Sequence, residues 1–334
     1  SEFWKKFSLR DKEDLTFFKK IYLKRFPDIL KNHSVPRIPK VLHYIWVGPR
    51  EFPEKSISYV ESFLKLHPDW TFKFWTDNPS RSPPHPSMQV CLISDINSPF
   101  LEKYLEKTDN YGEKSDLIRY EILYQEGGIY VDHDIECYHS FEKLVSSLDF
   151  FAGLEPPHRN SGIDTRIFPC NAVIGAKPFH PILLRSKEIV AERWDSVESC
   201  FPYTDAKSLT LKVLHRTFHS FTLAAKEVID RNGSKDVIFP ASFFYPDRIT
   251  SKKSLERWKK NGLVWTSHKC DGIWKPQEKL DSPTNKIDVL KAKNKVLSKK
   301  YKQAKILLFL NFVACGFCLY FLLKDKNGKK ILGI

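Results

Sequence analysis

Short apolar runs alternate with helical patterns from residue 40 onwards, and this alternation restricts the fold more than any other feature of the sequence. The run KVLHYIWVG (40–48) is apolar and β-branched and is followed by proline, which is typical of a buried parallel strand. A helical pattern from about Ser56 to Leu66 and a second strand, TFKFWT (71–76), come next. Strand, helix and strand in this order predict an α/β sheet.

The alternation continues in the segment SDLIRYEILYQEGGIYVD (115–132). Ser115 is suited to cap a helix, and Gly127 and Gly128 are suited to end it in left-handed geometry. The apolar residues of this helix fall on one face: Leu117, Ile118, Ile122 and Leu123. The run IYVD is then expected to be a short strand that emerges just before two aspartates.

The two aspartates form the pattern D-x-D. On an extended chain alternate side chains share a face, so we expect Asp132 and Asp134 to point the same way and His133 to point away. Ligands of open α/β sheets bind beyond the carboxyl ends of the strands. With no basic residue adjacent, the two carboxylates would repel each other unless a cation lies between them, and Mg²⁺ or Mn²⁺ suits oxygen ligands. A surface turn is the alternative for so short a pattern.

Asp116 and Arg119 lie one helix upstream, and their spacing puts both on one helix face. Such a pair would grip a polar ligand, because the carboxylate accepts hydrogen bonds from sugar hydroxyls and the guanidinium donates to phosphate or hydroxyl oxygens. A solvated ion pair is the alternative. His215 and His219 are spaced for zinc, but without a third ligand nearby packing is favoured.

Most of the positive charge lies near the ends of the chain. The formal net charge of the 334 residues is +14, and lysines are dense in the first 25 residues and in KAKNKVLSKKYKQAK (291–305). No zinc-finger, RNP or basic-zipper pattern accompanies this charge, so we expect no nucleic-acid partner. The seven cysteines have no framework spacing, which argues against a disulfide scaffold.

Three blocks resemble the glycosyltransferases with a sugar-binding D-x-D region: IPKVLHYIWVG, KSDLIRYEILYQEGGIYVDHDIE and SHKCDGIW. This family includes yeast-type initiating mannosyltransferases and inositol-phosphoceramide mannosyltransferases and, more distantly, the glucosylating clostridial cytotoxins. The resemblance runs from about Ile38 to Trp274. It implies a GT-A fold, which is a Rossmann-like mixed sheet flanked by helices. It also implies a metal-dependent, retaining transfer of a hexose from a UDP- or GDP-linked sugar to a lipid, glycan or protein.

Carried over by position, the resemblance implies roles for individual residues. Trp46 would stack on the nucleotide base, with a core aromatic at a strand end as the alternative. Asp116 and Arg119 would hold the donor sugar. Asp134 would bind Mn²⁺ or Mg²⁺ directly, and Asp132 would contact the ribose or sugar and a metal-bound water.

The third block departs from the family pattern. Where relatives often have H-H-W-x-G-S-W, residues 268–274 read HKCDGIW, so His268 and Trp274 are kept while the second His, the middle Trp and the Ser are not. His268 is the candidate for a third metal ligand or a diphosphate contact, with a structural role as the alternative, and Trp274 is a candidate donor contact. Asn171, in PCNAVIGAKPFHP, resembles the family's active-site asparagine.

These parts favour a front-side displacement. No enzymic nucleophile is obvious, the metal would neutralise the departing diphosphate, and that phosphate can take the acceptor's proton. One alternative is a metal-dependent phosphohydrolase, for which the sequence lacks further His/Asp ligands or a nucleophile motif. The other is a catalytically inactive relative that binds membranes or scaffolds a partner.

The run ILLFLNFVACGFCLYFLL (306–323) has no charged residue and as a helix would be about 27 Å long, close to the thickness of a bilayer core. It predicts a single transmembrane helix, with a buried core helix as the alternative. The expected parts are a basic helical segment outside the main fold (1–35), the catalytic domain (36–285), a lysine-rich juxtamembrane segment (286–305), this helix and a basic tail (324–334). The expected location is a Golgi or other secretory membrane, or a tail-anchored position facing the cytoplasm.

Overall fold

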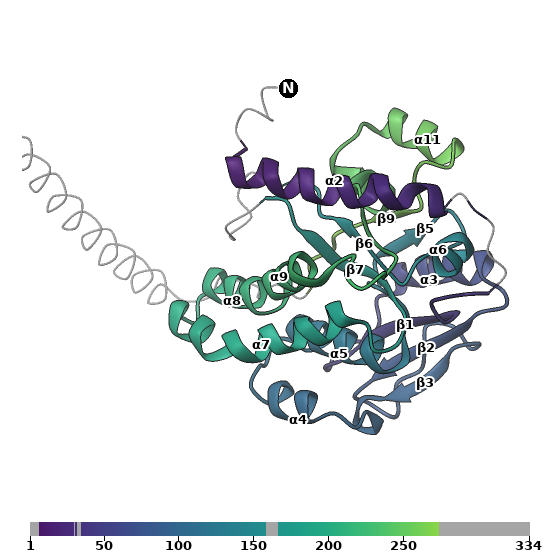
Figure 1. Ribbon diagram of the computed structural model, residues 1–334. Helices are drawn as coiled ribbons and strands as arrows, with labels where there is room; N and C mark the ends of the chain where they lie inside the picture. The colour runs from purple at the N-terminus through teal and green to yellow at the C-terminus, as the bar shows by residue number, and fades with distance from the viewer. Residues whose placement is uncertain (1–6, 30, 32–34, 158–165, 274–334) are drawn as a thin grey trace, which may run out of the picture. The chain divides into compact units, whose positions relative to one another are not determined.

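The structure is a computed structural model that describes residues 7–29, 31, 35–157 and 166–273 (Figure 1). The strands are β1 (Val41–Trp46), β2 (Thr71–Thr76), β3 (Gln89–Leu92), β4 (Gly128–Val131), β5 (Ile135–Cys137), β6 (Phe150–Leu154), β7 (Pro169–Ala176), β8 (Asp236–Phe239) and β9 (Thr266–His268). The α-helices are α2 (Leu9–Ile29), α3 (Glu54–Leu66), α4 (Pro99–Leu105), α5 (Tyr111–Glu126), α6 (Glu142–Ser147), α7 (Pro181–Cys200), α8 (Ala206–Val213), α9 (His219–Val228), α10 (Ala241–Phe244) and α11 (Lys252–Lys260). A π-helical turn, η2 (Leu214–Phe218), joins α8 to α9.

Seven strands form one mixed sheet in the order β3-β2-β1-β4-β7-β6-β8. All of them run parallel except β7, which is antiparallel to both of its neighbours. A separate antiparallel pair is formed by β5 and β9. The three strands predicted from the sequence are β1, β2 and β4, and the predicted α/β class with a mixed sheet flanked by helices is confirmed.

Helices cover both faces of the sheet, and an apolar core fills each side. One core lies between the sheet and helices that include α5, α7 and α9, and the other lies between the sheet and α3 and α6. Neighbouring residues of a strand alternate between the two: Tyr130 belongs to the first core and Val131 to the second. This alternation follows from the pleat of the strand. The site described below lies where β4 leaves the two cores.

Helix α2 belongs to this fold, so the expectation that residues 1–35 lie outside it is wrong for Leu9–Ile29. The helix packs along β8, which is an edge strand of the sheet. Phe18 and Ile21 are buried in the first core, and the Arg25 guanidinium donates to the Ser234 carbonyl at 2.6 Å. An uncovered edge strand exposes unpaired backbone groups, which a covering helix protects.

Helix α5 begins earlier than predicted. Asn110, not Ser115, is its N-cap, and the Asn110 side chain accepts a hydrogen bond from the Glu113 N–H at 2.9 Å. The predicted end is confirmed, since Gly127 and Gly128 have φ values of +66° and +98°. A β-carbon on Gly128 would lie 2.6 Å from the carbonyl oxygen of Val41. Both this close approach and the positive φ therefore require glycine at this position.

The middle of α5 is buried on every side, not on one apolar face. It contacts β1, β4 and β7 on one side and α7 and the π-helical turn on another. Asp116 and Arg119 are therefore enclosed with the apolar residues, with exposed fractions of 4% and 5%. The alternative of a solvated surface ion pair is excluded by this burial.

Within the described part of the chain, no helix is long and apolar enough to cross a membrane. The predicted transmembrane helix at 306–323 lies outside the described residues, as do the juxtamembrane segment, the basic tail and residues 274–285 of the predicted catalytic domain.

Candidate active site

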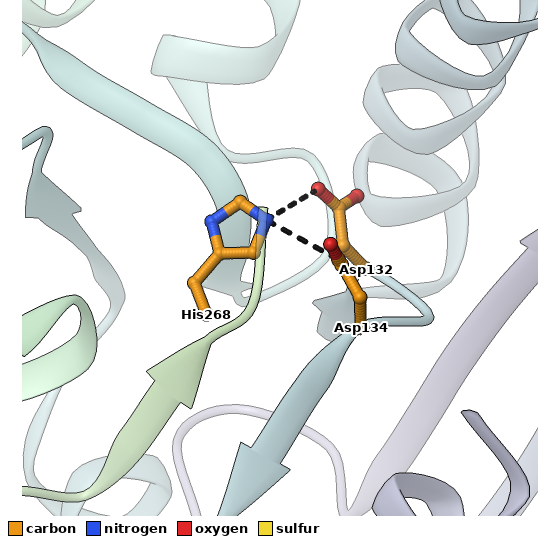
Figure 2. Close-up of side chains that lie close together, drawn as sticks. All are labelled: Asp132, Asp134 and His268. Carbon is orange, nitrogen blue, oxygen red and sulfur yellow. Dashed lines mark ion pairs between the residues drawn. The ribbon is translucent and has the colours of Figure 1, made fainter. Parts of the chain in front are cut away.

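The D-x-D aspartates lie in a tight turn directly after β4. The Asp132 N–H donates to the Ala172 carbonyl at 2.9 Å, and the Ile135 N–H donates back to the Asp132 carbonyl at 3.3 Å. The expected extended conformation is therefore wrong at residues 132–134, but the turn still brings the two carboxylates toward each other. The predicted convergence of Asp132 and Asp134 is confirmed (Figure 2).

His268 faces both carboxylates from β9, which pairs with β5 immediately after the turn (Figure 2). Its Nε2 lies 3.2 Å from Asp134 Oδ1 and 3.9 Å from Asp132 Oδ2. The three groups offer ligand atoms that all lie within 4.8 Å of one another. Two carboxylate oxygens and one imidazole nitrogen form a donor set that fits Mn²⁺, or Mg²⁺ with added water.

The two ion-paired groups shift each other's pKa in opposite directions. Burial opposes the charge of Asp134, but the hydrogen bond and the positive charge of His268 lower the Asp134 pKa far below its usual value. Burial likewise disfavours the imidazolium, yet Asp134 raises the pKa of His268 well above its usual value. Without a metal, a protonated His268 balances the carboxylates. Because a metal binds the neutral imidazole, metal binding would release that proton.

Arg119 is a second positive charge beside the D-x-D turn, which the sequence did not reveal as a neighbour. Its guanidinium lies 2.9 Å from Asp116 Oδ1 and 3.3 Å from Asp132 Oδ1, and it donates to the Asn171 carbonyl at 2.7 Å. The Tyr130 ring lies beneath it, with the guanidinium carbon 4.1 Å from the ring centroid. The expectation that no basic residue adjoins the aspartates holds for the sequence but not for the fold.

Asp116 is held on both of its oxygens. Arg119 binds Oδ1, and the Thr217 hydroxyl lies 2.5 Å from Oδ2. Burial raises the pKa of Asp116 to about 6, against the lowering effects of Arg119 and Thr217. The carboxylate is thus fixed in direction but poorly compensated in charge.

Trp46 lies at the end of β1, as predicted, but little of it is exposed. Only 9% of the residue is accessible, and its indole N–H donates to the Arg50 carbonyl at 2.7 Å. The rings of Phe52 and His133 pack edge-on against it, with centroid-to-centroid distances of 5.3 and 5.1 Å. This packing fits a core aromatic at a strand end, and stacking on a base stays a prediction. His133 contacts Trp46 and Ser56, but one of its ring nitrogens also lies within 4.8 Å of an Asp134 carboxylate oxygen, so the expectation that it points away from the aspartates is not confirmed.

Asn171 is buried on β7, and its side chain is directed at α5. Its amide Nδ2 donates to the Tyr120 hydroxyl at 3.2 Å, while its carbonyl accepts from Arg119. Asn171 therefore borders the site chiefly through its backbone, and a role for its side chain stays a prediction. Trp274 lies outside the described residues.

The zinc alternative at His215 and His219 finds no support in the described residues. The two groups there that could hold a metal are Asp132, Asp134 and His268, and His133, Asp134 and Asp271. Neither contains His215 or His219, whose rings pack against each other at 5.6 Å.

Three residues of the site were missed in the sequence. Tyr130 donates its hydroxyl hydrogen to Asp132 at 2.6 Å, and the period-2 alternation of the strand could have placed it there. Asp271 lies beside Asp134, because its backbone N–H donates a hydrogen bond to Asp134 Oδ2 at 2.7 Å. The Asp271 carboxylate forms an ion pair with Lys55. Thr217 had no local signal, because it reaches Asp116 across 101 residues of sequence.

Residues 53–151 match the family described as a glycosyltransferase sugar-binding region containing a DXD motif. In this segment the chain is similar to a glycosyltransferase sugar-binding region. The resemblance inferred from the sequence is confirmed by this match, which includes Asp116, Arg119, Asp132 and Asp134.

The chain is similar to several known proteins. Inositol phosphoceramide mannosyltransferase 3 of Schizosaccharomyces pombe is 34% identical over 158 residues, which cover 47% of this chain and 38% of that protein. Mannosyl phosphorylinositol ceramide synthase CSH1 of Saccharomyces cerevisiae is 30% identical over 149 residues, covering 44% and 34%. Among solved structures, the PaToxG glycosyltransferase has a TM-score of 0.44 at 19% identity, over 66% of this chain and 78% of that one. The chain thus spans little more than a third of the length of these two yeast relatives.

Proposed function

We propose that this chain is a metal-dependent, retaining glycosyltransferase with a GT-A fold that moves a hexose from a nucleotide sugar to an acceptor. The convergence of Asp132, Asp134 and His268 beyond the end of β4 carries the proposal. The match of residues 53–151 to a sugar-binding region supports a sugar donor as the ligand. The parallel strands β1 and β4, which end beside this cluster, support a binding site at the edge of the sheet.

Asp134 and His268 would hold the metal directly, with Asp132 nearer to the donor. Asp134 is the more buried of the two aspartates, with 5% of its side chain exposed against 24% for Asp132. A bound Mn²⁺ or Mg²⁺ would supply charge stabilisation to the diphosphate leaving group.

Asp116 and Arg119 would hold and orient the hexose. Asp116 keeps acceptor capacity for sugar hydroxyls, because each of its oxygens has further lone pairs beyond those used by Arg119 and Thr217. Arg119 would place a fixed positive charge between the sugar and the D-x-D turn. Front-side displacement then requires only positioning, electrostatic stabilisation and exclusion of water, and the departing phosphate takes the proton of the acceptor hydroxyl.

For the substrates, the names of the yeast relatives point to mannose and to an inositol phosphoceramide. We therefore propose GDP-mannose as the first donor to test and a membrane sphingolipid as the first acceptor, ahead of a glycan or a protein. UDP-linked hexoses are the competing donors.

A screen of donor hydrolysis tests this function. The full chain is assayed with GDP-mannose, UDP-glucose and UDP-galactose, with and without Mn²⁺, beside Asp134→Ala and the control Asp195→Ala, which changes an exposed aspartate on α7. We expect Mn²⁺-dependent release of one sugar by the wild type and the control and its loss in Asp134→Ala. Turnover without metal, or turnover kept in Asp134→Ala, would contradict the proposal. A folded wild type that hydrolyses no donor would favour an inactive relative.

A further inference from the structure

The π-helical turn between α8 and α9 contacts α5 along one face. Its Arg216 guanidinium lies 3.4 Å from Glu113, its Thr217 hydroxyl lies 2.5 Å from Asp116, and its Thr217 carbonyl accepts from the Tyr120 hydroxyl at 3.3 Å. Glu113, Asp116 and Tyr120 are spaced three and four residues apart, so they form one stripe on α5.

These contacts suggest why the turn is π-helical and not α-helical. Five residues, Leu214–Phe218, are π-helical, and the His219 N–H bonds back to the Leu214 carbonyl, five residues earlier. Such bulges are rare and are frequently found at functional sites, where they rotate the side chains that follow out of the ordinary helical register. Here the bulge brings two consecutive residues, Arg216 and Thr217, onto the same neighbouring helix.

Thr217 is placed to control the direction of the Asp116 carboxylate. Thr217 is completely buried, and its hydroxyl lies between Asp116 Oδ2 at 2.5 Å and the Val213 carbonyl at 2.9 Å. With Arg119 on Oδ1 and Thr217 on Oδ2, the plane of the carboxylate cannot turn without breaking one contact. Arg119 in turn reaches Asp132 of the D-x-D turn.

We propose that Thr217 is a positioning residue for the donor sugar, which acts by fixing Asp116 from the π-helical turn. This inference rests on the proposed function, because it assigns Asp116 to the sugar. The side chain and carbonyl of Thr217 bond Asp116, Val213 and Tyr120 and not the proposed metal ligands, so its effect should fall on the sugar and not on the nucleoside diphosphate. A structural role alone, in which the threonine only bonds the carbonyl four residues back, would not make that distinction.

The chain supplies a matched control for that structural role. Thr222 on α9 is also buried, and its hydroxyl bonds the Phe218 carbonyl, four residues back, at 3.0 Å. Thr222→Val therefore removes the same kind of helical hydrogen bond without touching Asp116. Thr217→Ser keeps the hydroxyl and serves as the conservative variant.

The test measures binding of GDP, GDP-mannose, UDP and UDP-glucose to the full chain with Mn²⁺ by titration calorimetry. In Thr217→Val we expect the affinity for the preferred nucleotide sugar to fall about tenfold, in line with the loss of a hydrogen bond to a charged group, while the affinity for its nucleoside diphosphate stays within about twofold. Thr217→Ser should restore the wild-type values, and Thr222→Val should leave them unchanged.

Two results would overturn the inference while leaving the proposed function intact. In one, Thr217→Val binds the nucleotide sugar as the wild type does; in the other, it loses sugar and diphosphate affinity equally. A wild type that binds the diphosphate and the nucleotide sugar equally and turns over no donor would overturn the proposed function, and the inference with it.

Discussion

Two arginine–aspartate pairs of this fold, each with a buried carboxylate, differ in how completely that carboxylate is satisfied. At the start of β6, Asp149 receives two hydrogen bonds from Arg37, at 2.9 and 2.8 Å, in a side-by-side arrangement. Beyond the end of β4, Arg119 divides its guanidinium between Asp116 and Asp132. The first pair is closed, whereas the second is shared among three residues and keeps bonding capacity for a ligand.

The pKa values of the two carboxyls express this difference. Burial acts against the charge of both, but Arg37 and the Lys235 N–H lower the pKa of Asp149 below its usual value. For Asp116, burial outweighs Arg119 and Thr217 and raises the pKa to about 6. A closed pair stabilises the fold, and an incompletely compensated one is typical of a functional site.

The largest expected effect is on catalytic activity, which should depend on Arg119 and not on Arg37. Arg119→Ala should lower kcat for donor hydrolysis by ~100-fold or more, because it removes a fixed charge beside the reacting groups. Arg37→Ala should keep kcat per folded molecule within about twofold, since Arg37 contacts no residue of the site. Steady-state kinetics on both variants, corrected for the folded fraction, checks the comparison. Equal losses in the two would remove the distinction between the pairs.

The next effect is on the free energy of unfolding, which should depend more on Asp149 than on Asp116. At pH 7, Asp149→Asn should lower the free energy of unfolding by ~2 kcal/mol, because an amide donor then faces Arg37 and the Lys235 N–H. Asp116→Asn should lower it by less, because removing a poorly compensated buried charge offsets part of the cost of leaving the Arg119 guanidinium with Asp132 as its remaining carboxylate partner. Urea denaturation followed by fluorescence measures both. A greater loss for Asp116→Asn than for Asp149→Asn would contradict this view of the site.

Metal binding should stabilise the protein only when Asp132, Asp134 and His268 are all present. Mn²⁺ at ten times its dissociation constant should raise the free energy of unfolding by ~1.4 kcal/mol, visible as a higher Tm. His268→Ala should weaken this effect and Asp134→Ala should remove it, while Arg37→Ala should keep it. A Tm increase of the same size in Asp134→Ala would place the metal elsewhere.

The smallest effect is the pH dependence, and its sign is opposite for the two aspartates. The raised pKa of Asp116 means that the folded protein holds this proton more tightly than the unfolded chain, so this group makes stability fall as pH rises from ~4 to about 6. The lowered pKa of Asp149 means that its stabilisation is present above pH ~4 and is lost as pH falls further. Relative to the wild type, Asp116→Asn should gain ~1 kcal/mol between pH 4.5 and 6, and the loss in Asp149→Asn should shrink below pH 4. Parallel stability curves for all three proteins would contradict these assignments.

Local patterns were enough to predict three of the strands and the two aspartates at the centre of the site. The apolar runs located β1, β2 and β4, and the D-x-D spacing brought out Asp132 and Asp134, because each of these features depends on residues that are close in sequence. The start of α5 was misplaced because Asn110 and Ser115 are both good caps, and only the path of the chain decides between them.

What the sequence did not predict depends on contacts between distant segments. Thr217 reaches Asp116 only after the π-helical turn has packed against α5, and α2 joins the fold only because β8, more than 200 residues later, is an edge strand. Helical periodicity alone also gives no sign of a π-helical turn, since one extra residue in a turn leaves the local composition unchanged.

Titration of the full chain with GDP-mannose and the two UDP-hexoses, with and without Mn²⁺, measures whether donor binding depends on a metal at the D-x-D turn. We expect one nucleotide sugar to bind the wild type in the presence of Mn²⁺, at least ~10-fold more weakly in its absence, and equally weakly in Asp134→Ala with Mn²⁺. Binding that is the same with and without metal, or that is unchanged in Asp134→Ala, would contradict a metal-dependent donor site at the D-x-D turn.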